Sequence, residues 1–199
     1  FTPIQKERNP PMALRTKNAI RRSFIELLAE RPFDKISVRD IAERSEVTRN
    51  TFYYYYTDIY ALAEDVFESE IERLSESANS YESWQKAFLA ATAFTAENKR
   101  MIQHLHSSAH RDILERYYHK TILTAMLAYV RKEAEGLDVS ESKVVALARF
   151  YTAALAGLSI EWLANGMKGE PDAFLADLGD MLDGNIRRSL ERGCAHTAQ

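Results

Sequence analysis

Long stretches without helix breakers are the feature that most limits how this chain can fold. Its 199 residues include only five prolines and seven glycines, and these gather at a few places. Between them, apolar residues recur three and four positions apart, which is the spacing that gives a helix one apolar face. The pattern predicts an all-α protein of about nine helices.

The composition is that of an ordinary globular protein. Apolar residues make up 46% of the chain and charged residues 28%, so a packed core is expected. The single cysteine, Cys194, excludes an internal disulfide and suits a reducing compartment. No stretch approaches the roughly 20 apolar residues that span a bilayer, and the first residues lack the layout of a signal peptide. We therefore expect a cytoplasmic protein that crosses no membrane.

Charge is distributed unevenly along the chain. Residues 1–60 hold 11 Lys and Arg against 8 Asp and Glu, whereas the remainder holds 15 against 21, giving net charges of +3 and −6. A basic head on an acidic body suits a protein that touches phosphates at one end only.

Two short helices joined by a tight turn are predicted near the N-terminus. Ser37 and Asp40 have the spacing of a capping box, which would begin a helix over residues 38–44. After a turn over residues 45–47, Thr48 is placed to cap a second helix that ends near Tyr55 and turns Phe52 inward. Longer helices are predicted on either side, over residues 14–30, 58–74, 81–95, 99–106, 111–135, 140–165 and 171–192.

The second short helix carries side chains suited to reading DNA. Arginine can make two hydrogen bonds to guanine, asparagine can do the same to adenine, and a tyrosine hydroxyl can bond a phosphate. The pattern presents such groups outward at Arg49, Asn50, Tyr53 and Tyr54.

The segment SVRDIAERSEVTRNTFYYYYTDIYAL, residues 37–62, resembles the helix-turn-helix of the TetR family of bacterial transcriptional regulators. The matching residues are Val47, Thr51, Phe52 and Tyr53, and the family's buried phenylalanine corresponds to Tyr56, which we expect in the core. Three positions depart from the family pattern. Glu46 stands where a turn glycine is common, Tyr55 where a histidine is usual, and Ile59 where a lysine often contacts phosphate.

The resemblance implies two domains: a helix-turn-helix DNA-binding domain over residues 12–60, called the head below, and a helical ligand-sensing and dimerisation domain over residues 61–199, called the body. In the head, the start of the first short helix is expected to hold a phosphate and the preceding long helix to grip the flanking backbone. The complete set of predicted DNA-binding residues is Arg15, Lys17, Ser37, Val38, Arg39, Thr48, Arg49, Asn50, Thr51, Tyr53, Tyr54 and Tyr55.

In this family the last two long helices pair with their copies in a second subunit, and two heads are needed for adjacent half-sites. The resemblance therefore implies a homodimer. Apolar stripes on the predicted helices 140–165 and 171–192 supply the expected interface, although sequence cannot separate interface residues from those that fill the protomer core. The predicted interface residues are Leu155, Leu158, Trp162, Phe174, Leu178, Met181 and Leu182.

The function implied is that of a repressor that leaves double-stranded DNA when a small molecule binds the body. The alternative is a coactivator that works through a protein partner. Glu46 and Ile59 favour it because they weaken phosphate contacts. The runs TFYYYYTDIYALAEDVF and YTAALAGLSIEWLANGMKGEP also resemble a branch of the family that contains regulators of dihydroxyacetone kinase operons.

Catalysis finds little support, since the chain has no phosphate-binding glycine loop, dinucleotide fingerprint or zinc-protease motif. The histidines at 104, 106 and 110 could suggest a metal, but Ser107 and Ser108 interrupt the helix and no acid or cysteine completes a set. We expect no enzyme, no cofactor and no metal.

Overall fold

The computed structural model describes residues 12–77, 82–168, 171–182 and 184–195, and within them the chain is helical, with no strand. The order is α1 (Met12–Glu30), a short 3-10 turn η1 (Phe33–Lys35), α2 (Val38–Arg44), α3 (Arg49–Tyr55), α4 (Ile59–Ser77), α5 (Trp84–Glu97), α6 (Lys99–His106), α7 (Asp112–Glu133), α8 (Glu141–Ala164), α9 (Pro171–Leu182) and α10 (Asn185–Ala195). The predicted all-α fold is confirmed.

One predicted helix is wrong in the described residues. The apolar period from residue 171 to 192 predicts a single helix, but the chain forms α9 and α10 instead. Gly184 has a φ of +66° between them, a left-handed conformation that glycine adopts without steric cost and that ends a helix. The described residues thus contain ten α-helices rather than about nine.

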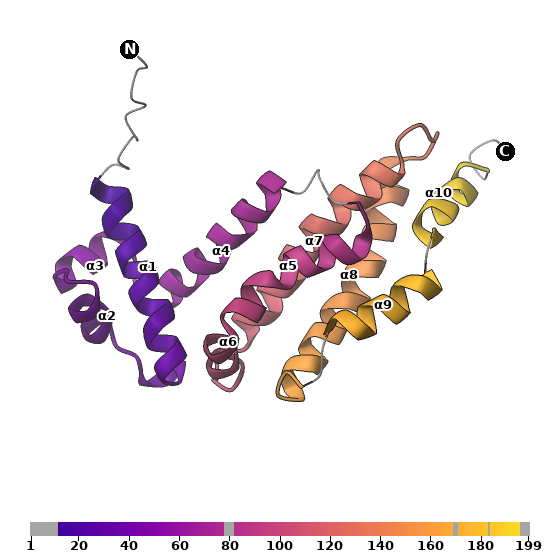
Figure 1. Ribbon diagram of the computed structural model, residues 1–199. Coiled ribbons are helices and arrows are strands. Elements are labelled where there is room, and N and C mark those ends of the chain that lie inside the picture. The colour runs from indigo at the N-terminus through magenta and orange to yellow at the C-terminus, as the bar shows by residue number, and fades with distance from the viewer. Residues whose placement is uncertain (1–11, 78–81, 169–170, 183, 196–199) are drawn as a thin grey trace, which may run out of the picture.

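The head is a small bundle of α1, α2 and α3 at one end of the molecule (Figure 1). Its core is formed by fully buried side chains from all three helices, among them Phe24, Ile41 and Phe52. α4 starts at Ile59, shortly after α3, and runs toward the body, where it packs on α7. A second contact joins α1 to α6. The head is therefore attached to the body through α4 and α6.

The body is organised around α7, which packs against α4, α5, α8 and α10. Apolar residues of α7 such as Ile122 and Met126 are fully buried. The hydroxyl of Tyr118 is buried with them and shares a hydrogen bond of 2.7 Å with Oγ1 of Thr95 on α5. A buried polar group that keeps a partner avoids a desolvation cost, so this pair fixes α5 against α7.

The expectation that no segment is apolar enough to span a bilayer needs a correction. By length and composition alone α8 could cross a membrane, since its most apolar 18-residue window has a mean hydropathy of 1.4. A core helix of a water-soluble protein passes the same test, so this is weak support for a membrane span. Only 33% of that window is buried within the protomer. An apolar helix that its own chain covers so incompletely has a face left for a partner.

Candidate nucleic-acid interface

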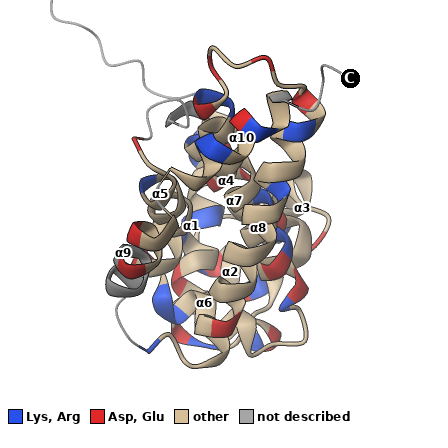
Figure 2. Cartoon of the chain, turned by 90° about the vertical axis from the view of Figure 1, so that its right-hand side faces the viewer, with Lys and Arg blue, Asp and Glu red and all other residues tan. Residues whose placement is uncertain are grey.

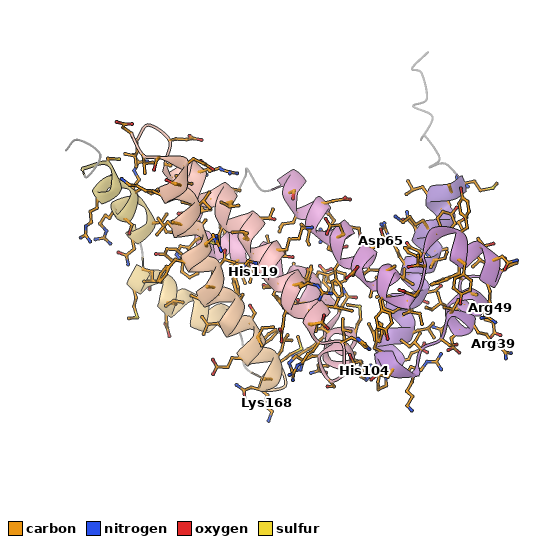
Figure 3. All side chains as sticks on the ribbon, turned by 180° about the vertical axis from the view of Figure 1, so that it is seen from behind. Arg39, Arg49, Asp65, His104, His119 and Lys168 are labelled. Carbon is orange, nitrogen blue, oxygen red and sulfur yellow. The ribbon has the colours of Figure 1, made fainter. Side chains whose placement is uncertain are left out.

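The N-terminus of α3 is fixed by its own side chains. Oγ1 of Thr48 accepts a hydrogen bond from the backbone N–H of Thr51 at 3.1 Å, and the two hydroxyls lie 2.9 Å apart. Phe52 is completely buried on the inner side of the helix, while Arg49 and Asn50 are exposed. In the part of the chain that the structure describes, Arg49 has no ion-pair partner. Figure 3 shows it at the outer edge of the head, where its guanidinium can meet an external anion.

The run of four tyrosines divides between surface and core as the helical period requires. Tyr54 is 81% exposed and Tyr53 48%, whereas Tyr55 is half-buried and Tyr56 is buried. The expected core position of Tyr56 is confirmed. A large aromatic side chain left four-fifths exposed on the same short helix as Arg49 gives α3 a surface suited to contact sugar rings, thymine methyl groups and phosphates.

The start of α2 is closed by the predicted capping box. Oγ of Ser37 accepts from the N–H of Asp40 at 3.3 Å, and the Asp40 carboxylate accepts from the N–H of Ser37 at 2.8 Å and from its hydroxyl at 2.6 Å. These hydrogen bonds from Ser37 lower the pKa of Asp40. Arg31 lies 3.1 Å from the same carboxylate. Both donors of Ser37 are therefore already engaged within the protein.

The other predicted phosphate contacts differ in their availability. Arg15 is exposed and, like Arg49, has no ion-pair partner among the described residues. Arg39 is exposed but pairs with Glu43 at 2.7 Å, one helical turn away. Val38 is half-buried and packs on the core. Lys17 bonds a carboxylate of α4 instead of pointing away from the protein.

The turn between α2 and α3 holds Glu46 at the position where the family commonly has a glycine. Glu46 has a φ of +55°, in the left-handed region that non-glycine residues rarely adopt. The N–H of Val47 returns to the carbonyl of Ala42 at 3.0 Å, which closes the turn. Glycine would adopt this conformation without the clash of a Cβ atom, so Glu46 strains the turn. Its exposed carboxylate also adds negative charge beside α3.

A carboxylate on α4 joins this helix to two elements of the head, α1 and the end of α3, and sequence reasoning missed it. Asp65 accepts hydrogen bonds from Lys17 and Arg21 of α1 and from the hydroxyl of Tyr56, the residue that ends α3. Figure 3 shows Asp65 on α4 where this helix meets the head. Two signals could have found it: an acid inside the apolar stripe of α4, and two cations one helical turn apart on α1.

Burial and hydrogen bonding act in opposite directions on this group. Burial by itself would raise the pKa of Asp65, but hydrogen bonds from Arg21, Lys17 and Tyr56 outweigh it and lower the pKa to about 2. The same pairing raises the pKa of Arg21. Burial, together with the hydrogen bond to Asp65, raises the pKa of Tyr56, so its hydroxyl keeps its proton and acts as a donor. The cluster therefore consists of one carboxylate, two cations and a neutral phenol at neutral pH.

The residues predicted for a dimer interface do not share one environment. Leu155 is buried within the protomer, and four others are half-buried: Leu158, Trp162, Leu178 and Leu182. Met181 is 78% exposed. The side chain of Phe174 lies outside the described part of the structure. Conversely, Phe150 on α8 is 68% exposed although it was not among the predicted residues.

Two of the three histidines that suggested a metal, His104 and His110, are engaged in other contacts. Nδ1 of His104 lies 2.7 Å from the carbonyl oxygen of Leu28, and Nε2 of His110 lies 3.1 Å from the hydroxyl of Tyr60. Among the described residues no group of three or more potential ligands is placed to hold a metal ion. His104 and His110 instead connect the body to the head.

Two family models match the chain. Residues 23–66, which contain α2 and α3, match the model described as "Bacterial regulatory proteins, tetR family". Residues 82–184, more than half of the chain, match the model described as "Transcriptional regulator C-terminal region".

Two curated relatives align with parts of the chain. The HTH-type dhaKLM operon transcriptional activator DhaS of Lactococcus lactis subsp. lactis (strain IL1403) is 27% identical over 95 residues, which are 48% of this chain and 51% of that protein. The uncharacterized HTH-type transcriptional regulator YxbF of Bacillus subtilis (strain 168) is 33% identical over 58 residues, 29% of this chain and 15% of that protein. The aligned segments thus span about half of the first relative and much less of the second.

Solved structures share the fold over most of the chain. The dihydroxyacetone kinase operon activator DhaS has a TM-score of 0.71 at 20% identity, with 87% of this chain and 97% of that one covered. FadR, the fatty acid degradation regulator from Bacillus halodurans, has a TM-score of 0.60 at 13% identity, with coverages of 92% and 99%. NalD, the secondary repressor of the MexAB-OprM multidrug efflux pump in Pseudomonas aeruginosa, has a TM-score of 0.57 at 19% identity, with 89% of this chain and 98% of that one covered. At these identities the likeness is one of fold.

Proposed function

The chain belongs to the tetR family of bacterial regulatory proteins, and on this basis we propose that it binds operator DNA as a homodimer and represses transcription until a small molecule occupies its body. Members of the family are transcriptional regulators rather than enzymes. The observation that carries the DNA-binding proposal is the outer surface of α3. It combines an exposed arginine that has no ion-pair partner in the described residues with a tyrosine that is 81% exposed.

Each of these side chains has a distinct use at a DNA surface. An arginine without an internal partner loses no ion pair when it bonds guanine or phosphate, so Arg49 is the best placed to read a base. Asn50 is exposed beside it and can bond adenine. Tyr54 offers a ring for sugar or a thymine methyl and a hydroxyl for phosphate. Because α3 starts at a capped position and is anchored by Phe52, these groups are presented on a fixed backbone.

Homodimerisation is supported by the uncovered face of α8. Between Phe150 and Ile160 the helix carries no charged residue, and Figure 2 shows this stretch free of Lys, Arg, Asp and Glu. Phe150 is 68% exposed, and Ala153, Ala154 and Gly157 are exposed near it. Small residues let two helices approach closely, while Phe150 supplies buried area. We propose that this face, together with Met181 of α9, meets its copy in a second subunit.

Release by an effector requires that the body change the placement of the head. The body contacts the head along two routes: Nδ1 of His104 on α6 lies 2.7 Å from the carbonyl oxygen of Leu28 in α1, and Nε2 of His110 lies 3.1 Å from the hydroxyl of Tyr60 at the start of α4. A ligand that binds one arrangement of these helices better than the other shifts the population by that difference in affinity. We propose that the regulator acts in this way in the cytoplasm.

The DNA-binding proposal can be tested by fluorescence anisotropy with two duplexes, one from the region flanking the gene and one scrambled, at two salt concentrations. The proposal expects tighter, salt-sensitive binding to the first duplex, with two protomers or a multiple at each site. Arg49→Ala should weaken that binding about ten- to a hundredfold, because a bidentate base contact discriminates by about 1–3 kcal/mol.

A matched control is Arg100→Ala, which removes the same charge from the exposed surface of α6 in the body. It should change operator affinity by less than about twofold. Equal affinity of the wild-type protein for both duplexes would overturn the proposal.

A second candidate function is activation through a protein partner. It is favoured by the likeness in both sequence and fold to DhaS, which is named as an operon activator. In vitro transcription from the flanking promoter separates the two: the repressor proposal expects less transcript when the protein is added. An increase that requires a second protein, recovered by pull-down with the purified regulator, would support the activator instead.

A further inference from the structure

The carboxylate of Asp65 is a junction between the three helices that set the position of the DNA-reading surface. Oδ1 accepts from Nζ of Lys17 at 2.8 Å and from Nη2 of Arg21 at 2.8 Å. Oδ2 accepts from Nε of Arg21 at 2.6 Å and from the hydroxyl of Tyr56 at 2.6 Å. Lys17 and Arg21 belong to α1, Tyr56 ends α3, and Asp65 belongs to α4. The Asp65 side chain therefore connects α4 to both α1 and the end of α3.

The geometry of this junction is restrictive. Arg21 meets Asp65 with two parallel hydrogen bonds, a pairing that fixes direction as well as distance. The three charged side chains are only 20–33% exposed, so water screens their attraction less than it would on an open surface. The ring of Tyr56 also lies 5.8 Å from the ammonium of Lys17. Tyr56 is thus fixed at its ring by the core and at its hydroxyl by α4.

The junction also changes the charge that the head offers to DNA. Lys17 was predicted to grip the backbone, and Arg21 lies one helical turn beyond it. Both are directed to Asp65 instead. Contacts from cations to phosphates strengthen binding to any sequence, whereas contacts to base edges distinguish one sequence from another. Holding two cations inside the protein while fixing α3 therefore favours discrimination over general affinity.

We propose that Asp65 is a positioning residue for DNA recognition, which fixes α3 against α1 and α4 and withholds Lys17 and Arg21 from the DNA backbone. This inference rests on the proposed function as a DNA-binding regulator. It assigns to one carboxylate of α4 a control over the ratio of specific to non-specific affinity, although Asp65 itself touches no DNA.

Asp65→Asn is the main test, measured by anisotropy on the flanking and the scrambled duplex over a series of salt concentrations. Loss of the charge frees two cations and loosens Tyr56. Affinity for the flanking duplex should fall about tenfold, while affinity for the scrambled duplex at low salt should rise severalfold. The salt dependence on the scrambled duplex should steepen by up to about two phosphate contacts, each contributing a slope of about −0.9. A purely structural defect would lower both affinities together.

Two further variants separate the parts of the proposal. Tyr56→Phe removes the bond that anchors α3 but leaves Lys17 and Arg21 paired with Asp65. It should weaken specific binding and leave binding to the scrambled duplex unchanged. Glu68→Gln is the matched control, since it also removes one negative charge from α4. Glu68 lies close to Asp65 in the sequence but pairs with Lys120 of α7. It should change neither the ratio of the affinities for the flanking and scrambled duplexes nor the salt dependence of binding by more than about twofold.

Circular dichroism melts of each variant show whether it is folded at the assay temperature, and Tyr56→Phe keeps the test decisive if Asp65→Asn does not fold. If the wild-type protein discriminates between duplexes but Tyr56→Phe, and Asp65→Asn where it folds, behave like Glu68→Gln, the inference is overturned and the proposed function stands. If the wild-type protein does not discriminate, the proposed function fails and the inference fails with it.

Discussion

The head and the body of this chain leave different kinds of side chain uncovered. On the head, α3 exposes Arg49, Asn50 and Tyr54, which combine positive charge, hydrogen-bonding groups and a ring. On the body, α8 exposes Phe150 and small apolar residues over a stretch without charge. Figure 3 shows side chains of Arg39 and Arg49 projecting from the outer head, whereas Figure 2 shows the uncharged length of α8.

The difference indicates two kinds of partner. A polyanion is attracted by cations and by groups that can bond base edges, whereas a second copy of the same helix is attracted by apolar area from which water can be excluded. The two surfaces lie in separate parts of the molecule, the head and the body, which are linked by α4 and α6. Changes to one surface should therefore affect binding there without unfolding the other.

The largest expected effect is a difference in stability between substitutions at a buried and at an exposed aromatic residue of α3. Phe52→Ala removes a fully buried ring and should destabilise the head by about 3–5 kcal/mol. Tyr54→Ala, two residues away and 81% exposed, should change the free energy of unfolding by less than about 0.5 kcal/mol while weakening operator binding. Thermal melts and anisotropy measure the two quantities. Equal loss of stability in both variants would contradict the assignment of Tyr54 to a binding surface.

The next effect concerns the body. Phe150→Asp places a charge on the uncovered face of α8 and should weaken dimerisation by about 2–4 kcal/mol, the range of an interface hot spot. The protomer should stay folded because the side chain is exposed. Sedimentation velocity over a range of concentrations follows the dimer. Leu89→Asp, at another exposed apolar position on α5, serves as the control. A dimer that survives Phe150→Asp would place the interface elsewhere.

A smaller effect tests the junction between the two regions at acid pH. The folded-state pKa of Asp65, about 2, is below its unfolded value near 3.9, so its contribution is complete above about pH 4 and is lost as pH falls toward 2. Between pH 5 and pH 2 the wild-type free energy of unfolding should fall by about 2 kcal/mol more than that of Asp65→Asn. Urea titrations at several pH values measure this difference. If the free energies of unfolding of the two proteins fell equally between pH 5 and pH 2, the carboxylate would not be stabilised by its partners.

The smallest effect concerns the turn that orients α3. Glu46→Gly should stabilise the protein by about 1 kcal/mol, because glycine relieves the left-handed strain at φ +55°. It also removes a negative charge near α3, so operator affinity should rise slightly. Ser45→Gly is the control, since its φ of −88° needs no glycine, and this variant should destabilise. If Glu46→Gly also destabilised, the strain would be offset by contacts of the Glu46 side chain.

Local signals in the sequence were sufficient for the head. The spacing from Ser37 to Asp40 predicts a capping box, Thr48 predicts the start of α3, and both are present with the expected partners. The helical period also predicts that Phe52 points inward, which is confirmed. These features involve residues three or four apart, whose interactions depend mainly on the helix itself.

Features that join distant parts of the chain were not visible in the same way. Asp65 bonds residues nine to 48 positions away, and no local period requires those pairings. The end of α9 near Gly184 was also missed, because an apolar period continues on both sides of it.

Apart from the break between α9 and α10, the sequence by itself determined which segments are helices, where the short helices of the head begin and which of their faces point inward, because backbone hydrogen bonds and side-chain period are local properties. Only the tertiary structure decided which side of α8 faces its own chain. Leu155 and Phe150 are both apolar residues on that helix, yet in the packed chain, where α8 lies mainly against α7, one is buried and the other is exposed. Burial depends on which helices cover a face, and that choice is made by the packing of the whole chain.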